Sequence, residues 1–163
     1  MLLTAIAERA EMRGRISVNV TDRDGMLSEI IVQLRQKASH ILAPETNSWL
    51  SEIHVHGVGF TRTREEVPST WRADMTKAVS ELNEKGSGLP ITVDEASAQS
   101  DELPVLIDSF QHFVRERRGV ALLLAGLPHN VSTLIDVDAT SFLRRAFKHT
   151  MDQISATDTS YAI

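Results

Sequence analysis

Apolar side chains recur at helical spacing in some stretches of the chain and form short, nearly unbroken runs in others. Short apolar runs predict strands, and strands that alternate with helices along the chain favour a mostly parallel sheet with helices on both faces. The pattern therefore predicts an α/β fold of three layers. Helices are predicted over residues 2–12, 27–38, 68–86 and 102–117, and strands over residues 15–20, 53–58, 89–93 and 120–124.

The helical spacing also predicts which side chains are buried. Asp22 or Asp24 is predicted to cap the second helix, and Gly86 to end the third. Residues 120–124 (VALLL) are predicted to form a fully buried strand. Leu127-Pro128 is interpreted as a turn, residues 140–149 are ambiguous, and residues 150–163 are weakly patterned. The predicted helix faces are Leu2, Leu3, Ile6 and Ala10; Leu27, Ile30, Ile31, Leu34 and Ala38; Trp71, Met75, Ala78, Val79 and Leu82; and Leu103, Leu106, Ile107, Phe110 and Val114.

Composition narrows the class of protein. The 163 residues are 42% hydrophobic and 24% charged, which is typical of one globular domain, residues 1–163. A net charge of −5 argues against general binding to a nucleic-acid backbone, and the lack of cysteine excludes thiolate chemistry. The N-terminus does not resemble a signal peptide, and the longest apolar run is too short to span a bilayer. We therefore expect a cytoplasmic protein without a membrane partner.

Two adjacent carboxylates end the apolar run Leu89–Val93, giving the sequence LPITVDE. In phosphate-handling α/β domains, an Asp at such a strand end holds Mg²⁺ through water and a Glu polarises the attacking water. The alternative is that two acids simply favour the start of a following helix. No G-x-x-x-x-G-K-[ST] phosphate loop occurs anywhere in the sequence.

A longer combination of segments is more specific than the acidic pair alone. The order ITVDE, FQHFVRE, VALLLAGLP and FLRRA, within about residues 2–150, resembles AAA-type P-loop ATPases of the bacterial origin-recognition/STAND-like group. The resemblance implies a partial P-loop ATPase core that lacks its first strand. It implies that Asp94 is the Mg²⁺-associated acid and Glu95 the catalytic base. The family's polar sensor falls on Ala125-Gly126, so that role has no clear owner, and Asn130 is a distant candidate.

The resemblance also gives Arg144 and Arg145 a possible role in cofactor binding. They could reach a γ-phosphate from a neighbouring subunit, pair with local acids, or simply be solvated at the surface. In the family, the phosphate loop directly precedes a helix similar to residues 2–12, and a helical lid would begin near Asp158. We therefore expect a truncated chain. ATP and Mg²⁺ are the family's cofactors, but this chain alone is predicted not to hydrolyse ATP.

The missing strand would lie beside residues 120–124 in the family's sheet. Its absence predicts an unpaired edge there, to be filled by residues 52–58, by the chain's tail, or by a second copy in a homo-oligomer. A second hypothesis is a non-enzymatic module that docks a protein or nucleic acid through Arg62, Arg64, Arg144 and Arg145. His54 and His56 have a spacing compatible with Zn²⁺, but no third ligand is nearby.

Overall fold

The structure is a computed structural model that describes residues 2–44, 46 and 67–151. The strand predicted over residues 53–58, with His54 and His56, lies outside the described residues, as do Arg62 and Arg64.

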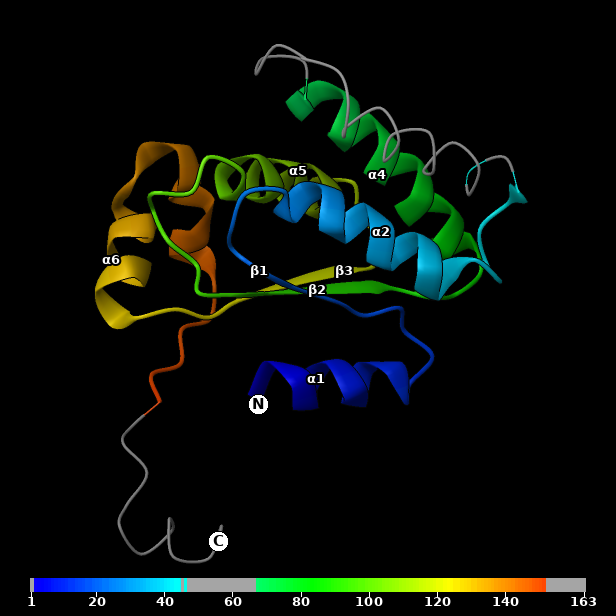
Figure 1. Ribbon diagram of the computed structural model, residues 1–163, viewed down its shortest axis with the longest axis horizontal. Coiled ribbons are helices and arrows are strands. Elements are labelled where there is room, and N and C mark those ends of the chain that lie inside the picture. Colours follow the sequence, from blue (N-terminus) through cyan, green and yellow to red (C-terminus); the bar gives the residue numbers. More distant parts are fainter. Residues whose placement is uncertain (1, 45, 47–66, 152–163) are drawn as a thin grey trace, which may run out of the picture.

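A parallel three-stranded sheet forms the centre of the described fold, in the order β1-β2-β3. The strands are β1 (Val18–Thr21), β2 (Leu89–Asp94) and β3 (Val120–Leu124). Helices α2 (Met26–Ala38) and α5 (Leu103–Arg115) cover one face, and α4 (Val67–Glu84) packs across them. Helix α1 (Leu2–Glu11) lies on the opposite face, against β1 and β2 (Figure 1). The prediction of an α/β fold with helices on both faces of a parallel sheet is thereby confirmed.

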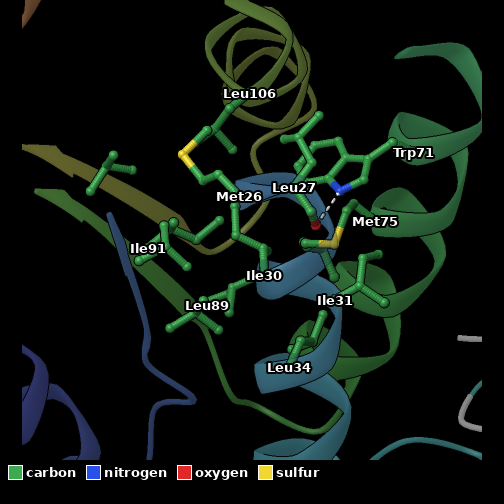
Figure 2. Close-up of a cluster of buried hydrophobic side chains, with 14 of the residues drawn as sticks. Met26, Leu27, Ile30, Ile31, Leu34, Trp71, Met75, Leu89, Ile91 and Leu106 are labelled. Carbon is green, nitrogen blue, oxygen red and sulfur yellow. Dashed lines mark hydrogen bonds between the residues drawn. The ribbon is translucent and has the colours of Figure 1, made fainter. Parts of the chain in front are cut away.

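The core lies between the sheet and the α2–α4–α5 face. All five apolar positions predicted for the second helix and all five predicted for the third are buried. Figure 2 shows Ile30 of α2 directed toward Leu89 and Ile91 of β2, and Trp71 and Met75 of α4 beside α2. The Trp71 indole N–H donates to the Leu27 carbonyl at 3.0 Å, which satisfies a polar group that would otherwise be buried without a partner.

Strand β1 begins later than the pattern predicts because of its neighbour. Residues 15–20 were the expected strand, whereas β1 spans Val18–Thr21. Val18 is in register with Ile91 of β2, and the residue before Ile91 is Pro90. Pro90 has no N–H to donate to β1. The regular ladder between the two strands therefore starts only after Pro90.

Several local predictions were wrong. Strand β3 is half-buried rather than fully buried, because it has a described partner strand on one side only. Val114 was predicted on the buried face of α5 but is 42% exposed. Its neighbour Phe113 faces the core in the last turn of the helix instead. Leu2 is 48% exposed at the start of α1.

The segment after β3 holds two further elements. The turn expected at Leu127-Pro128 is the start of α6 (Pro128–Asp136), in which Pro128 occupies the first turn, where its missing N–H costs no hydrogen bond. The ambiguous segment 140–149 begins inside η1 (Asp138–Arg145), a 3₁₀ element with a kink at Thr140. The element η1 packs on α5, where the rings of Phe110 and Phe142 meet edge to face with centroids 6.1 Å apart.

Candidate functional site

The acidic pair lies at the carboxyl end of the central strand. Asp94 is the last residue of β2, and both Asp94 and Glu95 are exposed. The Glu95 backbone N–H donates to Asp94 Oδ1 at 2.9 Å, which fixes the orientation of that carboxylate. Glu95 itself has φ of 58°, a left-handed conformation that is strained for a residue with a side chain. Strained backbone of this kind concentrates at functional sites, and this edge is where open parallel sheets bind ligands.

The ends of β2 and β3 are joined beside the acidic pair. The Ala125 N–H donates to the Val93 carbonyl at 2.9 Å, and the Ala96 N–H donates back to the Ala125 carbonyl at 2.8 Å. A Cβ atom on Gly126 would lie 2.6 Å from the Ala96 carbonyl oxygen, so this close approach requires glycine. Ala125-Gly126, where the resemblance predicts a polar sensor, therefore offers only backbone groups for hydrogen bonding. Asn130 is half-buried in the first turn of α6.

Asp22 is a third carboxylate at this edge, and its role was not predicted. It follows β1 directly, as Glu95 follows β2, and its N–H donates to the Asp94 carbonyl at 2.9 Å. Its Oδ2 accepts the Ser97 N–H at 2.9 Å, which ties the loop after Glu95 to the end of β1. Its Oδ1 is buried and has no hydrogen-bond partner among the described residues. The signal available in the sequence was the position itself, an acid at the end of the neighbouring parallel strand.

The predicted cap of α2 by Asp22 or Asp24 was wrong. The N-cap residue is Gly25, with φ of 85°, and it makes no side-chain cap. Instead, the Glu102 carboxylate accepts the Gly25 N–H at 2.9 Å and the Leu27 N–H at 2.7 Å. A carboxylate at a helix N-terminus also interacts favourably with the helix dipole. Glu102, the residue directly before α5, thus links the start of α2 to the start of α5.

Arg144 and Arg145 lie in the last turn of η1, and both are exposed. The Arg144 guanidinium donates to the carbonyls of Ile135 and Asp136, at 3.3 and 3.4 Å, where α6 ends. A cation is favourable at that helix terminus. Among the ion pairs of the described residues, none joins either arginine to Asp94 or Glu95. The structure therefore places Asp22 at the same end of the sheet as Asp94 and Glu95, through a backbone hydrogen bond between Asp22 and Asp94, and shows no ion pair between the acids and these arginines.

Helix α1 runs antiparallel to the strands, so that its N-terminus lies at the same end of the molecule as the strand carboxyl ends (Figure 1). The backbone N–H groups of its first turn have no partners within the helix, as at every helix N-terminus. No group of three or more potential metal ligands occurs in the described part of the chain. No helix there is both long and apolar enough to cross a bilayer.

Comparisons with known proteins add no assignment. No family model matches the sequence, and neither a curated protein nor a solved structure matches it significantly.

Proposed function

We propose that this chain forms part of an AAA-type P-loop ATPase core and contributes the acidic end of its nucleotide site. The observation that carries the proposal is the position of Asp94 and Glu95. Both are exposed at the carboxyl end of the central strand of a parallel sheet with helices on both faces. This is the end at which such sheets bind nucleotides.

The two carboxylates suit different tasks. Asp94, held by the Glu95 N–H, is a hard oxygen ligand for Mg²⁺ or for the water around it. Glu95 is free to accept a proton from an attacking water, because its exposed side chain has no described partner. A bound Mg²⁺–ATP would supply the electrophilic phosphate and neutralise its charge. Asp22 supports the arrangement by holding the Ser97 loop against the strand ends.

The topology supports a strand-loop-helix unit that ends in α1. A right-handed crossover through a helix on the α1 face would reach β1 only from a strand on the β3 side, since α2 and α5 lie on the other face. That strand would pair with β3, whose outer edge has no described partner. Its loop would then meet the N-terminus of α1, which is a favourable place for phosphate.

Without a phosphate loop, the acidic end is not expected to act alone. Phosphate binding in such sites comes mainly from loop N–H groups, the helix N-terminus and a lysine. The 163 residues contain no G-x-x-x-x-G-K-[ST] sequence. Mg²⁺ is held weakly by one or two carboxylates when no phosphate oxygens share it. The chain by itself is therefore proposed not to hydrolyse ATP. Arg144 and Arg145 would act on the nucleotide of a neighbouring subunit.

The test compares the unaltered chain with a fusion that supplies the phosphate loop. The unaltered chain should show the same background Mg²⁺-dependent ATP turnover as its Glu95→Gln variant. A fusion that adds a β-strand and a G-x-x-x-x-G-K-T loop before Met1 should bind Mg²⁺–ATP, measured by calorimetry. Asp94→Asn in the fusion should weaken that binding about tenfold or more, and Glu95→Gln should leave binding intact but stop turnover.

A matched fusion with the loop lysine replaced by alanine controls for the new segment. Turnover by the unfused chain well above Glu95→Gln would contradict the proposal. A folded fusion whose Mg²⁺–ATP binding does not respond to Asp94→Asn would contradict it as well.

A further inference from the structure

The two edges of the sheet are treated differently by the rest of the chain. At the β1 edge, the Gln33 side chain of α2 accepts the Asn19 N–H at 3.0 Å and donates to the Asn19 carbonyl at 2.6 Å. Lys37 of the same helix donates to the Ser17 carbonyl at 2.9 Å. Side chains thus satisfy backbone groups that an edge strand normally leaves open. The β1 edge is protected against pairing with another strand.

The β3 edge has no comparable cover within the described residues. Alternate residues of β3 bond to β2, as the Leu89-to-Gly119 and Ala125-to-Val93 bonds at either end show. The backbone groups of Leu122 and Leu124 therefore face away from β2. The strand VALLL holds no charge, proline or glycine, the features by which proteins usually block edge pairing.

The side chains of β3 alternate between the core and the α1 face of the sheet. Val120, Leu122 and Leu124 pack against the core, so Ala121 and Leu123 point to the other face. Helix α1 contacts β1 and β2, and a hollow of 570 Å³ lies beside it. Its lining is Ala5, Ile6 and Ala10 together with Arg9, Arg13 and Arg15, and it includes no residue of β3. Ala121 is exposed and Leu123 is half-buried.

Charge separates the two ends of the same edge. Arg117, which is exposed, and Arg118 precede β3, whereas Asp94 and Glu95 lie beside its carboxyl end. Arg118 is paired with Glu116 at 3.1 Å, and Arg117 has no described partner. An added antiparallel strand with the same charges would place opposite charges together at both ends. An added parallel copy would place like charges together.

We propose that a second copy of this chain pairs with the first along β3, antiparallel, about a two-fold axis through Leu122. Leu122 then faces its own counterpart. Val120, whose N–H already donates to the Arg118 carbonyl at 2.9 Å, offers its carbonyl to the partner's Leu124 N–H. The partner's Arg117 approaches Glu95, and the reverse contact forms at the other end. The interface is isologous and closed, so it gives a dimer rather than a filament. The inference goes beyond the proposed nucleotide role and does not depend on it, but a strand added before Met1 and a second copy of the chain would exclude each other at this edge.

The test is the oligomeric state of the full chain, by sedimentation velocity over a concentration series. The unaltered chain should be a dimer at micromolar concentration and should dissociate more readily at high salt. Ala121→Lys adds a charge beside the two-fold axis at an exposed position and should weaken the dimer at least about tenfold. Ser28→Lys, at an exposed position of α2, makes a matched control that should leave it unchanged.

A charge exchange distinguishes the proposed register from association elsewhere. Arg117→Glu and Glu95→Arg should each weaken the dimer, because each places like charges at both ends of the interface. The double variant should recover most of the affinity, since it restores opposite charges. A monomeric unaltered chain would overturn the proposal. So would a dimer that is indifferent to Ala121→Lys, or single charge changes whose losses simply add in the double variant.

Discussion

Individual carboxylates at the carboxyl edge of the sheet have separate structural tasks. Asp94 accepts the Glu95 N–H, Asp22 accepts the Ser97 N–H, and Glu102 accepts two N–H groups at the start of α2. Glu95 is the exception, because its exposed side chain has no described partner and its backbone is left-handed. This uncommitted carboxylate is the one to which the nucleotide proposal gives the attacking water.

Glu102 should contribute more to stability than an exposed acidic residue without such hydrogen bonds. Glu102→Ala leaves the Gly25 and Leu27 N–H groups without their carboxylate, and should lower the free energy of unfolding by about 1–2 kcal/mol. Glu102→Gln keeps an acceptor oxygen and should lose roughly half as much. Urea unfolding measures both. Glu8→Ala, at an exposed position of α1, serves as the control and should change stability by less than about 0.5 kcal/mol. Equal losses in Glu102→Ala and Glu8→Ala would contradict the capping role.

The helices differ in how they are held to the sheet. Helices α2 and α5 contact strands directly, whereas α4 packs on α2 and α5 as an outer layer. Trp71 is the main contact of α4 with α2, because its ring is buried and its N–H donates to the Leu27 carbonyl (Figure 2). The Arg72–Asp108 pair at 3.1 Å joins α4 to α5 but is solvent-exposed, and so contributes little.

Trp71 should accordingly carry most of the attachment of α4. Trp71→Ala leaves a cavity in the core and should lower the free energy of unfolding by about 3–5 kcal/mol. Trp71→Phe keeps most of the ring contact and loses the indole donor, for a cost of about 1 kcal/mol. Arg72→Ala provides the comparison and should cost less than about 1 kcal/mol. Similar losses in Trp71→Ala and Arg72→Ala, measured by urea unfolding, would show that α4 is held in another way.

Elements with strong local periodicity were predictable from the sequence, and features set by distant residues were not. The buried stripes of α2 and α4 follow from helical spacing alone. The cap of α2 comes from Glu102, which is far away in the sequence, so nearby Asp22 and Asp24 were the wrong candidates. The late start of β1 reflects Pro90 in another strand. The apolar run of β3 predicted full burial because a sequence pattern does not say how many strands flank it.

The candidate site was predictable in part, for the same reason. Asp94 and Glu95 stand out because they end an apolar run, and the structure places them at the carboxyl end of β2 as expected. Asp22 joins them only through the parallel pairing of β1 and β2. The contacts of Arg144 with the end of α6 could not be predicted, because only a turn at Leu127-Pro128, and no helix after it, was predicted there.

At the scale of the whole molecule, the sheet is asymmetric. One edge is satisfied by Gln33 and Lys37 of α2, whereas along β3 the outward backbone groups of Leu122 and Leu124 have no partner among the described residues. The nucleotide proposal and the dimer proposal each fill that open edge, and only one strand can pair with it at a time. The first places there a strand that carries a phosphate loop, and the second places there the β3 strand of another copy.

Residue-resolved amide hydrogen exchange along β3 tests the open edge most directly. In dilute solution, the Leu122 and Leu124 amides should exchange at least about tenfold faster than the Ala121 and Leu123 amides, which face β2. At concentrations that favour the dimer, Leu122 and Leu124 should become protected while Ala121 and Leu123 change little. Slow exchange of Leu122 and Leu124 in dilute, monomeric protein would contradict the account, because it would mean that the edge is already paired within a single chain.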